Sequence, residues 1–74
     1  MIVHYYRNQE FVEDFEIEIL SEDDSGFEFS AYKFPPPSII SGFKTEDERW
    51  INVSEIRHED TEDGRLLFYR AEYF

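Results

Sequence analysis

Apolar side chains recur at every second position along most of the chain. In residues 15–19, one phenylalanine and two isoleucines alternate with two glutamates, which is the pattern of a half-buried β-strand. The polar run 21–26 ends in glycine and predicts a turn. Residues 27–34 again carry apolar side chains at alternate positions. The pattern therefore predicts a β-hairpin with a long connection.

Three further segments have strand character. Residues 2–7 are rich in β-branched and aromatic side chains, which are common in strands. Residues 50–58 and 65–74 are separated by a segment, 61–64, that ends in Asp-Gly, and this dipeptide predicts a tight turn. The stretch 10–17, between the first strand and the hairpin, also permits one helical turn.

The segment 35–49 is the longest region without strand character. It opens with three consecutive prolines, which cannot donate hydrogen bonds to a sheet and favour an extended path. Thr45 and Glu48 have the spacing of a helix-capping box, so this segment has room for one short helical turn. Long segments of this kind often carry function, and we expect a mobile or functional loop here.

Together these elements predict an all-β fold, with the option of one short helical turn. Four to five antiparallel strands in a small meander can curl into a partly open barrel of the SH3-like or Sm-like kind. This comparison concerns the fold and carries no function. A chain of 74 residues allows one domain, 1–74. Because it has no cysteine, its core must be built from side chains, among them eight Phe, five Tyr and one Trp.

Charge gives the strongest indication of function. Eighteen acidic residues oppose seven basic ones, and the formal net charge is −11. Such a balance repels nucleic acid phosphates and anionic membranes and attracts basic surfaces. We therefore expect a protein partner with a basic surface, no direct nucleic acid binding and no membrane binding. Since no signal-peptide pattern or apolar run of about 20 residues is present, we expect a cytoplasmic protein.

Known patterns of catalytic and metal-binding residues do not fit this chain. A calcium loop aligned on Gly64 or on Gly26 would have Arg70 or Tyr32 where its final glutamate is required. A strand places His58 and its acidic neighbour on opposite faces, so they do not readily share a metal ion. The chain has neither a Gly-x-Ser-x-Gly motif nor a glycine-rich phosphate loop. We expect no enzymatic activity, no cofactor and no metal site.

Two acidic segments, 13–24 and 46–63, form the candidate binding surface. If they lie side by side, they create a broad negative face that imitates a polyanion; otherwise they are solvated faces that maintain solubility. Trp50 follows an acidic run and is the expected aromatic anchor. The predicted partner-binding residues are Glu16, Glu18, Glu22, Asp23, Asp24, Glu46, Asp47, Glu48 and Trp50.

The sequence supports two hypotheses about function. In the first, the chain is a small acidic binding or regulatory protein that docks on a basic surface of a protein partner. That surface is often one that binds nucleic acid, and the chain then acts as an anion-mimicking inhibitor or regulator. In the alternative, it is a structural module that forms a homodimer or larger oligomer through its aromatic edge, and its acids serve solubility only.

Overall fold

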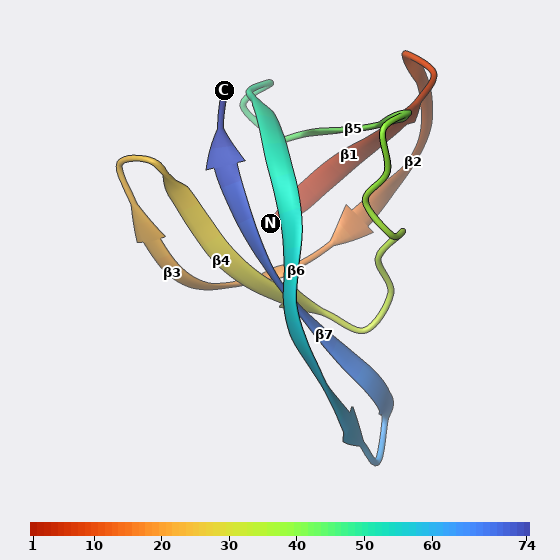
Figure 1. Ribbon diagram of the computed structural model, residues 1–74, viewed down its shortest axis with the longest axis vertical. Helices are drawn as coiled ribbons and strands as arrows, with labels where there is room; N and C mark the ends of the chain where they lie inside the picture. The colour runs from red at the N-terminus through yellow and green to blue at the C-terminus, as the bar shows by residue number, and fades with distance from the viewer.

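Seven β-strands and no helix make up the computed structural model, which describes residues 1–74 (Figure 1). All strand pairs are antiparallel, and the order across the sheet is β2-β1-β5-β6-β7-β4-β3. The all-β class and the small, partly open barrel predicted from the sequence are confirmed, with seven strands instead of four to five. No helix that could cross a membrane is present. The strands are β1 (Ile2–Arg7), β2 (Glu10–Glu16), β3 (Glu18–Asp23), β4 (Gly26–Ala31), β5 (Ser41–Lys44), β6 (Trp50–Thr61) and β7 (Gly64–Tyr73).

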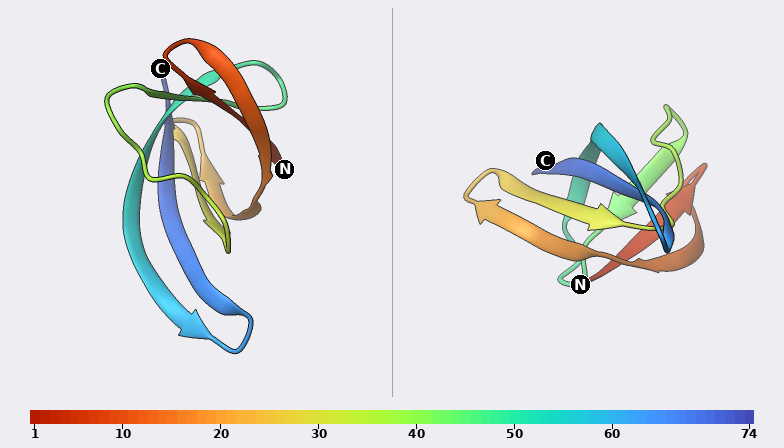
Figure 2. Two further views of the ribbon diagram at one scale, coloured as in Figure 1. Left: turned by 90° about the vertical axis from the view of Figure 1, so that its right-hand side faces the viewer. Right: turned by 90° about the horizontal axis from the view of Figure 1, so that it is seen from below.

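The sheet curls so strongly that its two outermost strands, β2 and β3, follow one another along a single bent segment of the chain. β2 and β3 stand at opposite ends of the strand order, yet only Ile17 separates them in the sequence. The Met1 amino group donates to the Ile17 carbonyl at 3.1 Å, and the Ile17 amide donates to the Met1 carbonyl at 2.9 Å. These bonds hold the bend against the start of β1. Figure 2 shows the curled sheet that results.

Aromatic side chains fill the inside of the curl. The loop residue Phe34 packs on Phe29, Phe43 and Tyr69, with ring centroids 5.1, 5.0 and 4.9 Å away. Phe34 was expected to end a strand; instead β4 ends at Ala31, and the chain turns so that Phe34 enters the core from a loop. The buried core residues are Val3, Ile17, Phe27, Phe29, Ala31, Phe34, Phe43, Ile51, Val53, Tyr69 and Ala71.

Two of the seven strands, β2 and β5, differ from the sequence-based prediction. Residues 10–17, where a helical turn was an option, form β2 and the bend, and the tight turn before them has Asn8 and Gln9 at φ values of 51° and 67°. Residues 41–44 were assigned to the long loop but form β5, which pairs with both β1 and β6. The turn predicted at 21–26 is shorter than expected, because β3 continues to Asp23 and β4 begins at Gly26.

The helical turn expected after Thr45 is absent. The Thr45 amide donates to the Arg49 carbonyl at 2.9 Å, and the Arg49 amide donates to Thr45 Oγ1 at 3.1 Å. Glu48 has a φ of 63°, in the left-handed region. This geometry reverses the chain so that Lys44 can pair with Trp50 across β5 and β6. Thr45 therefore organises a tight loop between strands, and the capping interpretation was wrong.

The far ends of β6 and β7 form a two-stranded arm (Figure 1, Figure 2). β6 is twelve residues long and β7 is ten, so β6 exceeds the predicted strand 50–58. A bulge interrupts their pairing between Glu55 and Arg57. Beyond it the hairpin extends away from the core, and its tip is exposed.

Candidate partner-binding surface

The predicted acidic residues lie in three separate places, and two of these meet. Glu16 and Glu18 flank the bend, Glu22–Asp24 lie at the β3–β4 turn, and Glu46–Glu48 lie in the β5–β6 loop. The Ile2 amide donates to Glu46 Oε1, and Ile2 is the register partner of Glu16. The structure therefore brings the β5–β6 loop next to the bend.

The two acidic segments do not form one continuous face. Glu59 and Asp60 lie on the arm, at the opposite end of β6 from Glu46, in a molecule whose longest dimension is 34 Å. Arg57 Nη1 lies 2.5 Å from Glu59 Oε1, and Arg65 Nε lies 3.2 Å from Asp60 Oδ1. These arm acids are paired with arginine and lie far from the bend. The shared face expected from the sequence is thus limited to the bend and the β5–β6 loop.

Asp23 is engaged within its own hairpin. Its carboxylate accepts hydrogen bonds from Arg70 Nη2 at 3.0 and 3.2 Å and from Ser25 Oγ at 2.8 Å. It also accepts bonds from the amides of Ser25 and Gly26 at 2.9 and 3.0 Å. The Arg70 bond, followed by the Ser25 bonds, holds the pKa of Asp23 well below its usual range. Asp23 therefore fixes the β3–β4 turn to β7.

We expect Asp23→Asn to reduce the acid sensitivity of the fold. A carboxylate whose pKa is lowered by folding stabilises the folded state above its unfolded pKa of 3.8, and this contribution is lost as the pH falls through the lower folded pKa. The melting temperatures of the wild type and of Asp23→Asn should therefore differ most at pH 5–6 and converge as the pH falls toward 2. Asp24→Asn is the control, and parallel melting curves for wild type and Asp23→Asn would contradict the assignment.

Two further groups have shifted pKa values. The hydrogen bond from Arg70 to Asp23 raises the pKa of Arg70. Burial, together with the Glu55 carboxylate, raises the pKa of the Tyr69 phenol. Both shifts favour the protonated form of the side chain. Arg70 stays charged on the outer side of β7, and Tyr69 stays neutral in the core.

The β5–β6 loop also uses its acids for local structure. Besides the Glu46 contact to β1, Asp47 Oδ1 accepts a hydrogen bond from the Thr45 hydroxyl. Glu48 adopts the left-handed backbone conformation that the loop requires. All three carboxylate residues remain exposed, so they still contribute negative charge beside the bend.

Trp50 belongs to an exposed aromatic cluster on the outer face of the sheet. Its ring lies 5.1 Å from that of Tyr6, and the Tyr6 ring lies 5.8 Å from that of Phe11. Lys44 Nζ lies 4.8 Å from the centre of the Trp50 ring, within cation–π range. Trp50 and Phe11 are 44% and 55% exposed, so this apolar surface is open to a partner. Ile39 and the half-buried Tyr6 help to line a hollow of about 290 Å³ beside Trp50.

The largest depression on the molecule runs along the bend between β2 and β3. It has a volume of about 890 Å³, and its lining includes Phe15, Ile17 and Leu66. Its opposite wall is formed by the chain at and beyond the end of β4, Ala31–Lys33. The groove exists because β3 stays paired with β4 while β2 turns away at the bend to pair with β1.

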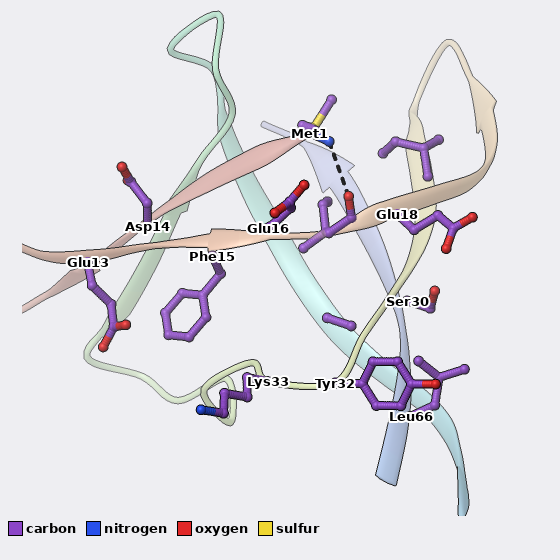
Figure 3. A pocket seen from close by; sticks show the side chains of 13 residues that line it. Met1, Glu13, Asp14, Phe15, Glu16, Glu18, Ser30, Tyr32, Lys33 and Leu66 are labelled. Carbon is purple, nitrogen blue, oxygen red and sulfur yellow. Dashed lines mark hydrogen bonds between the residues drawn. The ribbon is translucent and has the colours of Figure 1, made fainter. Parts of the chain in front are cut away.

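Acidic side chains dominate the charge of this groove. Glu13, Asp14, Glu16 and Glu18 line it, and Lys33 is its one basic residue. Figure 3 shows Glu13 and Phe15 pointing from β2 toward the wall that carries Tyr32 and Lys33, whereas Asp14 and Glu16 point to the other side. Asp14 Oδ1 also lies 2.5 Å from His4 Nδ1. The groove therefore combines an apolar floor with a negative rim.

Glu16 and Glu18 are the two predicted residues that line the groove, although their alternating pattern predicts no groove. The sequence predicts Glu13 and Asp14 only as part of the acidic segment 13–24, and Phe15 only as part of a strand. The outer aromatic cluster was also missed, apart from Trp50. Its signal was available: strand alternation in residues 2–7 sets Tyr6 on the face opposite Val3. No group of three or more His, Asp or Glu side chains has the arrangement of a metal site.

Comparison of the chain with protein-family models, with curated proteins and with solved structures found no match.

Proposed function

We propose that this protein binds a protein partner through a basic surface on that partner, and inhibits or regulates the partner by occupying this surface. The observation that carries the proposal is the groove at the bend, where four carboxylates and one lysine surround apolar side chains. The net charge of −11 would steer a basic partner toward the protein and speed association.

The charge at the bend extends beyond the groove. Glu46, Asp47 and Glu48 lie next to it through the Glu46 contact with Ile2, and they widen the negative surface. Trp50 lies at the start of β6, directly after this loop, and is exposed among other aromatic residues. Exposed aromatic side chains near charge are frequent energetic centres of interfaces. The proposal therefore assigns long-range attraction to the acids and short-range contact to Phe15 and Trp50.

The remaining predicted residues have a smaller part in this proposal. Asp23 is occupied by Arg70 and by its own turn, so its charge is largely neutralised locally. Glu22 and Asp24 lie at the same turn, on the hairpin that follows the bend. They add to the overall field but line none of the groove.

A matched pair of variants tests the proposal. Glu16→Gln/Glu18→Gln removes two charges from the groove, and Glu62→Gln/Asp63→Asn removes two charges from the tip of the arm. After a partner is captured from host lysate and purified, titration calorimetry should show affinity about tenfold lower for the groove variant. The tip variant should bind like the wild type. The proposal fails if the two variants bind alike, or if affinity is indifferent to salt between 50 and 500 mM.

The exposed aromatic cluster supports a second candidate function, a homo-oligomeric structural module. Phe11, Ile39 and Trp50 present apolar area that a second copy would cover. The charge of −11 on each copy opposes this association, so salt should promote it. Sedimentation velocity at several concentrations separates the two functions: a tight dimer that Trp50→Ala dissolves, without any captured partner, supports the structural module.

A further inference from the structure

The free edge of β2 indicates how a partner would be bound. This inference deepens the proposed function and rests on it. β2 pairs with β1 along one edge, and no backbone hydrogen bond joins its other edge to the rest of the chain. A row of unpaired amides and carbonyls on a strand edge is a template for an added strand. β2 is seven residues long, so this edge extends about 24 Å.

The groove lies along this free edge. Its two walls are β2, from Glu13 to the bend, and the segment Ala31–Lys33 beyond β4. Figure 3 shows these two segments diverging from the place where β3 and β4 are paired. An extended peptide laid in the groove would lie next to β2 and continue the sheet across its open side. Its backbone would find hydrogen-bonding groups that are otherwise left to water.

The side chains of β2 specify what such a strand must carry. Asp14 and Glu16 point to one side of β2, and Glu13 and Phe15 point to the other. Residues directly opposite each other on paired strands interact, and opposite charges stabilise the pair. The complementary strand therefore has basic residues facing Asp14 and Glu16, and an apolar residue facing Phe15.

We propose that the free edge of β2 binds an extended, basic segment of a protein partner as an additional β-strand, with the groove enclosing it. A second copy of this chain does not meet the requirement. Pairing two β2 edges would bring the carboxylates of Glu13, Asp14 and Glu16 from both copies together across one strand pair, and like charges across a strand pair destabilise it. Lys33, on the far wall, is the one basic side chain that the groove supplies.

The competing explanation is that these acids only protect the edge. Natural sheets often place charges on edge strands so that they do not aggregate. An edge that is merely protected binds no strand of any charge, whereas an edge built for recognition binds one of complementary charge. Peptide binding therefore separates the two explanations.

The probe is an end-capped heptapeptide, Lys-Thr-Lys-Val-Lys-Thr-Lys, which reads the same in both directions, so strand polarity does not matter. Two derivatives carry backbone N-methyl groups, one at the second, fourth and sixth residues and one at the third and fifth. Since alternate amides of an added strand point at its neighbour, one derivative should bind about tenfold or more weakly, and the other within about twofold of the parent. A version with Glu in place of Lys should not bind.

Variants of the protein locate the peptide. Glu16→Lys reverses a charge on the side of β2 that faces the lysines of the peptide and should weaken binding about tenfold, whereas Glu62→Lys, the same change at the arm tip, should have an effect below about twofold. Amide hydrogen exchange should show new protection in residues 12–16.

Equal effects of the two N-methylated peptides, absence of binding, or protection confined to another strand would overturn strand addition. Even if strand addition is overturned, the proposed function keeps its support under one condition. A partner must be captured in a salt-sensitive way, and Glu16→Gln/Glu18→Gln must weaken its binding.

Discussion

Replacing Gly26 with alanine is expected to lower the free energy of unfolding by about 3 kcal/mol or more. A Cβ atom on Gly26 would lie 1.9 Å from the Ala71 carbonyl oxygen. That oxygen belongs to β7, which is paired on both sides, with β4 and with β6. Relief would require the strands to move apart and lose pairing. Urea denaturation followed by circular dichroism measures the change.

Gly42→Ala is the matched control for Gly26→Ala. A Cβ atom on Gly42 would lie 3.0 Å from Cζ3 of Trp50, and that ring is half exposed and free to shift. The expected loss is below about 1 kcal/mol, accompanied by a change in tryptophan fluorescence. Comparable losses at the two glycines would mean that close backbone contact at Gly26 is not what requires glycine there.

Replacing Phe34 with alanine is expected to cost about 3–5 kcal/mol. Phe34 is 8% exposed and contacts four aromatic rings from β2, β4, β5 and β7. A domain of this size has a total stability of roughly 4–11 kcal/mol, so the alanine variant is expected to be largely unfolded at moderate temperature. Thermal melting and dispersion of NMR amide signals report the outcome.

Two further variants keep the Phe34 prediction testable. Phe34→Leu retains most of the volume and should cost less than about 1.5 kcal/mol, so its folded state remains measurable even if the alanine variant unfolds. Ile39→Ala alters a fully exposed residue of the same loop and should change stability by less than about 0.5 kcal/mol. If Phe34→Ala proves as mild as Ile39→Ala, the loop does not hold the core together.

Local alternation of apolar and polar residues was sufficient to predict the class of fold. The segments 2–7 and 50–58 lie in strands, and so does 65–74 except for its last residue. Where these strands cover the core, buried residues alternate with more exposed ones, as at Ile51 and Val53 in β6 and at Tyr69 and Ala71 in β7. β5 was missed since its four residues are too few to show a period, and they follow three prolines. β5 forms because β1 and β6 both pair with it, and such long-range pairing leaves no mark in a short segment.

The groove could not have been predicted from the pattern. Phe15, Ile17 and Ile19 keep a period of two straight through the bend, so the sequence describes one strand where the structure has two. The bend follows from partners at distant positions: Met1 holds Ile17, and β2 and β3 pair with different halves of the sheet. The exposed position of Trp50 agrees with its assignment as an anchor, and its role in binding remains a prediction.

The place of β7 in the strand order has a consequence for assembly. β7 lies between β6 and β4, so without it the sheet is two pieces, β2-β1-β5-β6 and β4-β3, joined by the chain at Ile17 and through residues 32–40. During synthesis, both pieces must wait with open hydrogen-bonding edges until residues 64–73 leave the ribosome. Pairings that span this much of the chain form slowly, and the waiting pieces are exposed to mispairing. Because like charges repel, the net charge of −11 opposes the association of two such incomplete sheets.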